Sequence, residues 1–525
     1  METVLFAIFS AVYALCAALA FIRGAHMFQL NSYGAATHLK WTAHNISSAV
    51  PNILSLILAA VCFAADAALD FEGAASTVLH IIAICATVIF ALANLEKKNQ
   101  KTPLVFTARV KRLAVTYTLL FIAAGACAWL LKDAGAGYAI MLLAFALQPF
   151  AILAANLINA PIEAAVRRYY LRDALRILRS CPSLRVIGIT GSYGKTSMKY
   201  FLCEILKQKY NVLMTPGNYN TPMGVVKTVR SSLRGYHEIF LCEMGAKRVG
   251  EIKELCDIAA PSYGIVTSVG PQHLESFKSL DNIIRTKLEL ANNLQPGGKA
   301  FINIDNEYLR ENLPEGAVTY GTSYDADYSA KVISVSSSGT EFSVRCPDGT
   351  EHSFSTVLVG AHNVTNLCGA VAMAHFLGED MEEIAEGVSR ITPVPHRLQL
   401  IKKPGMTLID DAYNSNPSGC RAALDTLSCF EGMKILVTPG MVELGSEEER
   451  LNREFGREAA EVCDFVIPVG KKRAAPIVAG LRDGGFPVDK IFVAENIGEA
   501  MQKVYSLPSD GTKTVLLEND LPDNY

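Results

Sequence analysis

The sequence has few charged residues and no excess of either sign. Only 19% of the residues are charged, and 48 lysines and arginines face 51 aspartates and glutamates, which gives a formal net charge of -3 at pH 7. Domains that bind nucleic acid usually carry a concentrated basic surface. The composition therefore gives no electrostatic case for a nucleic-acid partner.

The thirteen cysteines form none of the short patterns that bind metals or build disulfide frameworks. No two are spaced as C-x-x-C, and no cysteine and histidine residues have the spacing of a zinc site. Disulfide scaffolds and zinc ribbons are thus disfavoured. We expect the cysteines to be reduced, in membrane helices and in a cytosolic domain.

Half of the residues are hydrophobic, and nearly all of the excess lies before residue 160. A helix needs about 20 apolar residues to cross the hydrocarbon layer of a membrane. Five uncharged stretches approach or exceed that length, and the second, with Pro51 and Asn52, is the least typical. The first lacks a basic start and a cleavage site, so we expect it to be retained rather than removed as a signal peptide. The stretches are residues 3–22, 49–65, 75–95, 113–131 and 138–158.

The loops between these stretches predict an orientation, because cytoplasmic loops are rich in lysine and arginine. Five spans with these flanks predict a protein of the cytoplasmic (inner) membrane with its N-terminus outside. The chain after residue 160 is then predicted to lie in the cytoplasm. Residues 162–178 are typical of an amphipathic helix with an arginine-rich face, which would lie on the anionic inner leaflet or act as a plain linker. The basic residues are Lys97, Lys98, Lys101, Arg109, Lys111 and Arg112 before the fourth span, and Arg167, Arg168, Arg172, Arg176 and Arg179 after the fifth.

From residue 185 onward, short β-branched runs alternate with helical patterns, which is typical of a parallel sheet covered by helices. The first series predicts strands at 185–189, 238–242, 264–269 and 300–303, and an antiparallel insertion at 320–358. The second predicts strands at 407–409, 435–438, 465–469, 491–493 and 515–517. We therefore expect a membrane domain of about five helices (1–160), a linker helix (161–184), a P-loop central α/β domain (185–393) and a Rossmann-like C-terminal α/β domain (394–525), with a hinge at 392–395.

The most specific motif is a hydrophobic strand that runs into a glycine-rich turn and then into Lys195 and Thr196 at the start of a helix. Glycines allow backbone N–H groups to surround phosphate oxygens, and the helix start adds positive potential. The lysine would reach the outer phosphates of ATP and the threonine hydroxyl would bind Mg²⁺. The strict pattern has a glycine where this chain has Ile189, so the loop is a variant.

This variant, with Thr190, Gly191, Gly194, Lys195 and Thr196, resembles that of the Mur ligase family. The resemblance covers residues 185–505, and further motifs follow in the family's order. They are Thr215-Pro-Gly-Asn-Tyr-Asn220, Glu243-Met-Gly-Ala246, Ser268-Val-Gly-Pro-Gln-His273-Leu-Glu275, Thr286-Lys-Leu-Glu289, Gly360-Ala-His-Asn-Val-Thr-Asn366, Pro395-His-Arg397, Asp410-Asp-Ala-Tyr-Asn-Ser-Asn-Pro417 and Gly440-Met-Val-Glu-Leu-Gly445.

The resemblance implies an ATP- and Mg²⁺-dependent ligase that activates a carboxylate as an acyl phosphate and joins it to an amine. The branch that it matches adds D-alanyl-D-alanine to a muramoyl peptide in peptidoglycan precursor synthesis. The implied catalytic residues are Lys195, Glu243, His273 and Lys287, and the implied metal ligands are Thr196, Glu243, His273 and a carbamylated Lys287. The implied nucleotide contacts are Thr190, Gly191, Ser192, Gly194, Lys195, Thr196, Ser197, Asn363, Asn366, Arg397 and Asp411, and the implied substrate contacts are Asn218, Asn220, Tyr413, Asn414 and Asn416.

Simpler interpretations of single residues stay open at this point. His273 would then be an ordinary loop residue, Glu243 a helix-cap partner and Lys287 a solvated lysine. Asn363 and Asn366 would cap a helix. Asp410 is the less functional of its pair, because strand alternation points it away from Asp411.

The chain departs from the family at both ends. Membrane spans replace the domain that holds the uridine diphosphate part of the substrate, and Leu517-Glu-Asn-Asp520 stands where the matched branch has a Lys-Gly-Ser-like strand end. These departures favour an acceptor presented at the membrane, such as a lipid-linked muropeptide, with membrane lipids as partners. A ligase for another amino-acid-containing polymer is the first alternative. An ATP-driven transporter is disfavoured, because the spans hold only neutral polar residues and no second ATPase motif is present.

Overall fold

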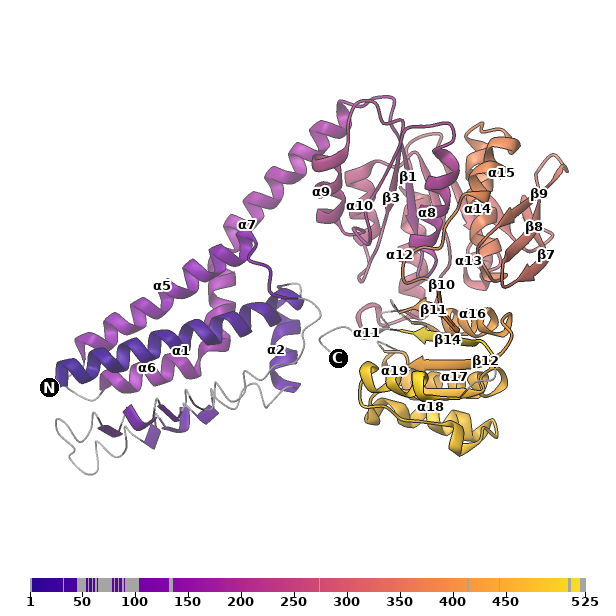
Figure 1. The fold of residues 1–525 in the computed structure, drawn as a ribbon. Helices are drawn as coiled ribbons and strands as arrows, with labels where there is room; N and C mark the ends of the chain where they lie inside the picture. The colour runs from indigo at the N-terminus through magenta and orange to yellow at the C-terminus, as the bar shows by residue number, and fades with distance from the viewer. Residues whose placement is uncertain are drawn as a thin grey trace. The chain divides into compact units, whose positions relative to one another are not determined.

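The chain forms two compact units, which divide between Arg168 and Tyr169. We name them the helical unit and the α/β unit. The computed structural model describes residues 2–31, 33–44, 103–131, 136–272, 274–412, 415–442, 444–508 and 511–519, with short pieces between 53 and 89. Figure 1 shows the elements of each unit, and their mutual placement is not considered.

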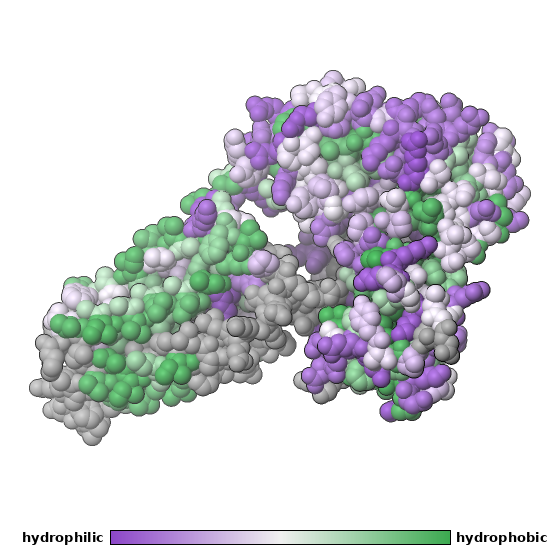
Figure 2. Space-filling model, viewed as in Figure 1, coloured by the Kyte–Doolittle hydropathy of each residue, from purple (hydrophilic) through white to green (hydrophobic). Residues whose placement is uncertain are grey.

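The described helices of the helical unit bury an aromatic core and present apolar side chains outward. Phe6, Phe9 and Tyr138 pack with ring centroids 4.8–6.4 Å apart. Three described helices are long and apolar enough to cross a membrane, and Figure 2 shows mostly apolar residues on the visible face of this unit. The helices are α1 (Glu2–Leu30), α2 (Ala35–His44), α5 (Ala108–Leu130), α6 (Ala136–Ala146) and α7 (Gln148–Arg179).

The first and fourth predicted spans are helical, as α1 and α5. Most of the second and third lies outside the described residues. The fifth prediction, one span over 138–158, is wrong, because the helix is interrupted at Leu147. Pro149 explains the interruption: its nitrogen cannot donate to the carbonyl of Phe145, and its ring clashes with that carbonyl.

The predicted amphipathic segment is the second half of α7 and not a separate helix. Its apolar residues Tyr170, Leu171, Ala174 and Ile177 join a buried cluster of the α/β unit. The guanidinium of Arg230 in α9 (Pro222–Ser232) donates to Asp173 at 2.8 Å. The expectation that this segment lies on the inner leaflet is therefore wrong for its last three turns, because protein covers the apolar face.

Nine described strands form the first sheet of the α/β unit, in the order β2-β3-β1-β4-β5-β6-β7-β8-β9. The strands from β2 to β7 run parallel, and the two hairpin-connected strands that follow are antiparallel. The predicted antiparallel segment is therefore confirmed, as an extension of the main sheet. The strands are β1 (Arg185–Thr190), β2 (Val212–Met214), β3 (Ile239–Glu243), β4 (Tyr263–Val266), β5 (Lys299–Asn303), β6 (Val318–Gly321), β7 (Tyr328–Ser336), β8 (Gly339–Arg345) and β9 (Glu351–Thr356).

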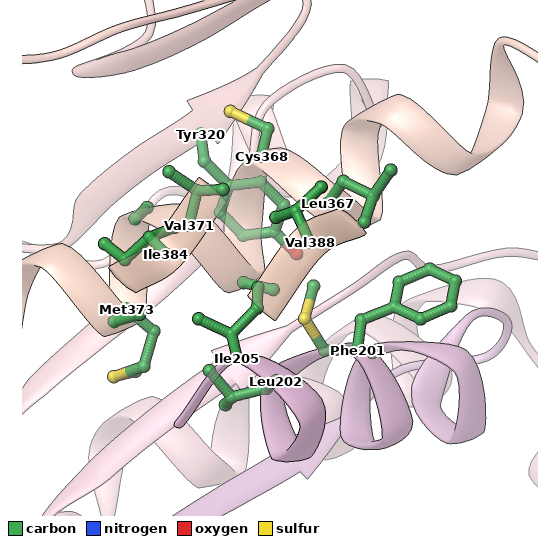
Figure 3. Packing of buried hydrophobic residues seen from close by; sticks show 14 of the residues in the cluster. Phe201, Leu202, Ile205, Tyr320, Leu367, Cys368, Val371, Met373, Ile384 and Val388 are labelled. Carbon is green, nitrogen blue, oxygen red and sulfur yellow. The ribbon is translucent and has the colours of Figure 1, made fainter. Parts of the chain in front are cut away.

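Helices cover both faces of this sheet, which explains why its strands are continuously hydrophobic. Along β3, Ile239 and Leu241 enter one buried cluster while Phe240 and Cys242 enter the other. Figure 3 shows the first cluster, where Phe201, Leu202 and Ile205 face the side chains of α14. The helices are α8 (Lys195–Leu206), α10 (Glu251–Ala259), α11 (Leu274–Phe277), α12 (Leu280–Asn292), α13 (Glu307–Glu311), α14 (His362–Phe376) and α15 (Met381–Ser389).

A second sheet has the strand order β10-β11-β14-β12-β13, with β10 antiparallel to β11 and the other neighbours parallel. Four of the five strands predicted for this region are present. The fifth, at 491–493, is wrong as a strand, because only isolated bridges join Ile491 and Ala494 to β13. The elements are β10 (Gln399–Lys403), β11 (Met406–Asp411), α16 (Pro417–Ser428), β12 (Met433–Thr438), α17 (Glu448–Val462), β13 (Phe465–Pro468), α18 (Lys471–Asp483), α19 (Ile497–Ser506) and β14 (Lys513–Glu518).

The packing of α8 against α14 predicts a local stability effect. Leu367 is fully buried in that cluster, so Leu367→Ala removes contacts and leaves a cavity. We expect the opening free energy of α8 and α14 to fall by about 2–5 kcal/mol, measured by native-state hydrogen exchange. Leu313→Ala, at a side chain that is 44% exposed, is the matched control. Equal exchange in the two variants would contradict this packing.

Candidate active site

The glycine-rich loop between β1 and α8 has the backbone that its sequence predicts. Gly191 has φ +150° and Gly194 has φ +79°. A Cβ atom at Gly191 would lie 2.1 Å from Thr267 Oγ1, and one at Gly194 would lie 3.1 Å from Asn366 Oδ1. Both positions therefore require glycine, for conformation and for space. The resulting turn brings backbone N–H groups to the start of α8, where a phosphate would bind.

Two of the predicted nucleotide contacts hold this loop through their side chains. Thr190 Oγ1 donates to the carbonyl of Met244 at 2.9 Å, and Ser192 Oγ bonds to Gly270 O at 3.2 Å. The backbone nitrogen of Ser192 also donates to Ser268 O at 2.6 Å. These bonds fix the loop to the ends of β3 and β4. The side chains of Thr190 and Ser192 therefore support the loop in this structure, and their contact with a nucleotide stays a prediction.

Lys195 folds back over the loop. Its Nζ donates to Gly191 O at 2.7 Å and to Ser192 O at 3.0 Å. The pKa of Lys195 is lowered to about 8. Burial is the main cause; Glu243 partly offsets it, and Arg397 adds a smaller lowering effect. Phosphate anions at the loop would favour the charged ammonium and give it stronger acceptors than carbonyl oxygens.

Glu243, at the end of β3, is the centre of the site and is almost completely buried. Thr196 Oγ1 lies 3.2 Å from Oε2, and Asn220 Nδ2 donates to Oε1 at 3.1 Å. β1 and β3 are adjacent parallel strands, with Ile189 paired to Glu243. The phosphate loop and this carboxylate therefore meet because both follow the carboxyl ends of neighbouring strands.

Lys199 is a functional residue that the sequence predictions missed. Its side chain is fully buried in α8, and its Nζ lies 2.8 Å from Glu243 Oε2 and 2.6 Å from Gly217 O. Lysines are almost never buried without a partner. The signal in the sequence was a lysine one turn after Lys195, between the core residues Met198 and Phe201. That position predicts a buried cation, and such a cation needs a carboxylate.

Mg²⁺ prefers hard oxygen ligands and shares its coordination sphere between protein carboxylates, phosphates and water. Thr196 and Glu243 supply such oxygens side by side, so their chemistry fits the ion. Among the described residues, no group of three histidine, cysteine or acidic side chains has the geometry of a complete metal site. The fit therefore requires oxygens from the nucleotide as well. His273, the other implied ligand, lies outside the described residues.

Lys287 lies in α12 with only 2% of its surface exposed. Burial holds its pKa well below the usual value, and the positive charge of Lys195 lowers it further. Its Nζ stands 6.0 Å from the centre of the Phe277 ring. The interpretation of Lys287 as a solvated surface lysine is wrong. A lowered pKa increases the neutral fraction of a buried amine, and the neutral form is the one that carbamylation requires.

The remaining nucleotide residues border the start of α14 and the connection to the second sheet. The Asn366 amide lies against Gly194, while Asn363 Nδ2 donates to Val359 O at 3.1 Å. A small recess of mixed polar and apolar lining lies beside the first turn of α8. Its lining includes Ser197, Phe201, Val359, Asn363, Val394 and Arg397.

The five implied substrate contacts lie in two places, in the loop after β2 and in the segment between β11 and α16. Asn416 caps α16, where its Oδ1 accepts from the backbone nitrogen of Gly419 at 2.9 Å. Asn218 lies in the loop that contains Gly217, whereas Tyr413 and Asn414 lie outside the described residues. Asn220 is already bonded to Glu243. Its described position therefore makes it a support of the metal carboxylate.

Asp410 and Asp411 have different partners, as strand alternation predicts. Asp410 Oδ2 bonds to His396 Nδ1 at 2.8 Å, and Asp411 Oδ1 accepts from the backbone nitrogen of Leu398 at 3.1 Å. Asp411 also faces Glu518, a buried residue of β14. Burial raises the pKa of both carboxyls. The charge of Asp411 raises the pKa of Glu518 further, whereas Arg397 partly offsets the rise at Asp411.

The comparisons with known proteins match this part of the chain. The family model described as "Mur ligase middle domain" matches residues 189–374, and "Mur ligase, glutamate ligase domain" matches residues 396–517. The UDP-N-acetylmuramoyl-tripeptide--D-alanyl-D-alanine ligase of Bacillus subtilis is 37% identical over 292 residues, or 55% of this chain and 63% of that protein. The protein of the same name from Escherichia coli is 30% identical over 380 residues, or 69% of this chain and 83% of that protein.

Solved structures give the same result. MurF from Acinetobacter baumannii has a TM-score of 0.62 at 27% identity and covers 68% of this chain and 78% of its own. MurF ligase from Thermotoga maritima in complex with ADP has a TM-score of 0.60 at 26% identity and covers 67% and 80%. The chain spans less than two thirds of the length of the Bacillus relative. Neither family model includes the helical unit.

The buried ion pair predicts a double-variant result. Lys199→Met leaves Glu243 buried without its counter-charge, so we expect the free energy of unfolding to fall by about 3–5 kcal/mol. Lys199→Met combined with Glu243→Gln removes both charges and restores most of that loss. Chemical denaturation of the full-length protein measures both values.

Lys207→Met is the matched control, because this lysine follows the same helix and its side chain is 49% exposed. We expect a change within about 0.5 kcal/mol there. If Lys199→Met and the double variant have equal free energies of unfolding, the charges of Lys199 and Glu243 do not stabilise each other, and the prediction is wrong.

Proposed function

The chain belongs to the Mur ligase family, and on that premise we propose that it joins D-alanyl-D-alanine to a muramoyl tripeptide with ATP. The product is a peptidoglycan precursor, and the reaction passes through an acyl phosphate. One observation carries the proposal: Lys195, Thr196 and Glu243 meet at the ends of adjacent strands, which is the arrangement that phosphoryl transfer to a carboxylate requires.

The chemistry must bring two anions together, the γ-phosphate of ATP and the carboxylate of the muramoyl peptide. Lys195 offers an ammonium group to the outer phosphates, and the backbone of the loop binds them from below. When bound to Thr196 and Glu243, Mg²⁺ supplies further positive charge against this repulsion. Lys199 balances the charge of the buried Glu243 carboxylate, whose oxygens lie beside Thr196.

We also propose that Lys287 carries a carbamate. Burial and the nearby charge of Lys195 favour the neutral form of this amine, and a neutral amine attacks carbon dioxide and releases one proton as the carbamate forms. Carbamylation would replace the positive charge of Lys287 by a negative one. The carbamate oxygens would then be ligands for a second divalent cation. His273 would bind the same ion.

Closure of the C-terminal domain brings Arg397 and Asp411 to the nucleotide in this proposal. The connection supports such a hinge, because His396 has φ +58° and Leu398 has φ +49°. Residues other than glycine rarely adopt this conformation, and strained backbone of this kind is found in segments that switch. Arg397 stands between these two residues.

The helical unit supports a location in the cytoplasmic membrane, with the α/β unit in the cytoplasm. Three described helices have the length and hydropathy of membrane spans. The enzyme would then meet its acceptor at the membrane surface, and a lipid-linked muropeptide is the acceptor that this location favours.

One observation favours a different amine as a second candidate. Glu518 ends β14, in the segment that stands where the matched branch has a Lys-Gly-Ser-like strand end, and it is buried beside Asp411. A cationic amino substrate would ionise this carboxyl pair. Ligation of diamino acids in preference to D-alanyl-D-alanine would establish this candidate.

The central role of Lys195 predicts a kinetic loss. Lys195→Ala removes the ammonium group from the outer phosphates, so we expect the rate of product formation to fall about a hundredfold or more. Mass spectrometry of products from the UDP-linked tripeptide, ATP and D-alanyl-D-alanine measures the rate. Lys207→Ala, on an exposed lysine at the end of the same helix, should retain the wild-type rate. A similar small loss in both variants would refute this role.

The environment of Lys287 predicts a carbamate that depends on pH. The neutral fraction of this amine rises with pH, and its lowered pKa makes that fraction larger at a given pH than for an exposed lysine. Labelled bicarbonate should give a carbamate carbon resonance in wild-type protein and none in Lys287→Gln. Lys253→Gln, which changes an exposed lysine, is the control. A spectrum without the resonance at elevated bicarbonate would exclude the modification.

A further inference from the structure

A group of polar side chains lies inside the helical unit, where α7 crosses the first turns of α5 (Figure 1). Arg109 Nη2 donates to Asn156 Oδ1 at 3.3 Å, and Thr116 Oγ1 donates to Asn159 Oδ1 at 3.0 Å. The surrounding surface is apolar, with Leu119 60% and Leu157 74% exposed. Polar and charged side chains are costly in such surroundings and usually mark a functional site.

The two arginines of this group differ in their charge balance. Arg112 forms two bonds to the carboxylate of Glu163, at 2.7 and 2.8 Å. Arg109 has no carboxylate partner among the described residues, and its bond to Asn156 reaches only a neutral amide oxygen. One positive charge of the group is thus uncompensated by the described part of the chain.

The guanidinium of Arg109 is nevertheless held in place. It lies 3.9 Å from the centre of the Tyr33 ring, just after the end of α1. Gln29 fixes the segment before α5 through two bonds to the backbone of Val105, both at 3.0 Å. An arginine oriented by stacking and by a neighbouring amide is preorganised for a planar, multidentate anion contact.

Two buried N–H donors of this group, Arg109 Nε and Asn159 Nδ2, have no hydrogen-bond partner among the described residues. The same holds for Asn31 Nδ2, two residues before Tyr33 in the chain. Asn159 is only 5% exposed. Asn156 and Asn159 lie one turn apart on α7, so the Asn159 donor is adjacent to the Arg109 pair. Several donors beside an uncompensated cation fit a ligand that is anionic and rich in acceptor oxygens.

We infer that this group, defined by Arg109, Asn156, Asn159 and Tyr33, binds the phosphate of a membrane lipid. Phosphate provides the negative charge and the acceptor oxygens that the group lacks. Arg109 precedes the fourth apolar stretch by four residues and belongs to the basic segment that contains Lys97, Lys98 and Lys101 in the sequence. That position corresponds to the depth of lipid headgroups on the cytoplasmic side.

The inference rests on the proposed membrane location and deepens it. If the acceptor peptide is carried by a polyprenyl diphosphate, this site would hold the diphosphate while the peptide reaches the ligase domains. An ordinary anionic phospholipid has the same phosphate chemistry and is distinguished by the experiment.

The test measures lipid binding to full-length protein in nanodiscs of neutral lipid, with added polyprenyl diphosphate, phosphatidylglycerol or free inorganic pyrophosphate. We expect polyprenyl diphosphate to bind, and Arg109→Gln to weaken this binding about tenfold or more. Lys111→Gln is the matched control. It removes one positive charge two residues after Arg109, and the Lys111 side chain is exposed, so this variant should leave lipid binding unchanged. Arg109→Lys should give an intermediate affinity.

Each outcome bears on the inference. If Arg109→Gln weakens the binding of both lipids equally, the result supports a general phosphate site. If it weakens the binding of polyprenyl diphosphate alone, the result supports a site for the lipid that carries the acceptor peptide. The inference is overturned if wild type, Arg109→Gln and Lys111→Gln bind polyprenyl diphosphate equally. It is also overturned if free pyrophosphate binds with the same affinity as either lipid. If Arg109→Gln does not fold, Asn159→Ala and Arg109→Lys decide by the same comparison.

Ligation of the soluble UDP-linked tripeptide is measured in parallel. The inference expects Arg109→Gln to keep this activity, because the site acts on the lipid and not on the chemistry. Absence of ligation in the wild type would count against the proposed function, whereas normal ligation without Arg109-dependent lipid binding would count against this inference alone.

Discussion

The structure depends on the placement of one buried carboxylate, Glu243, at the end of a central parallel strand. Desolvation makes an isolated carboxylate costly at this position, and the chain compensates with Lys199, Thr196 and Asn220. Three separate segments, the phosphate-loop helix, the loop after β2 and β3 itself, are thereby held together by one charge. The same charge is what a divalent cation needs beside the phosphates of a nucleotide. Stability and the proposed catalysis therefore use the same contact.

Much of the site could be predicted from local sequence patterns. The turn at Gly191 and Gly194 is specified by short-range steric rules, and the strands around it by hydrophobic runs. Lys199 was missed because its role depends on a partner 44 residues away in the sequence. The roles of Thr190 and Asn220 were assigned to ligands although their side chains bond within the protein. Long-range pairing of polar groups is what the sequence alone does not reveal.

The fold shows the same limit in both units. Pro149 interrupts a continuous apolar stretch that hydropathy treats as one span, and the apolar face of the last turns of α7 is covered by protein. The run at 491–493 has strand composition but lies at the edge of the second sheet, where it forms only isolated bridges. In both units the proposed anion sites lie at buried or stacked basic side chains, namely Arg109 in the helical unit and Lys195 with Lys287 in the α/β unit.

A structure of the full-length protein with Mg²⁺ and a non-hydrolysable ATP analogue tests the central claim most directly. The account predicts the triphosphate on the Gly191–Gly194 turn, the Lys195 ammonium moved from the loop carbonyls to the phosphates, and Mg²⁺ about 2.0–2.1 Å from Thr196 Oγ1 and a Glu243 oxygen. A nucleotide bound elsewhere, or a metal that leaves Glu243 without contact, would contradict it.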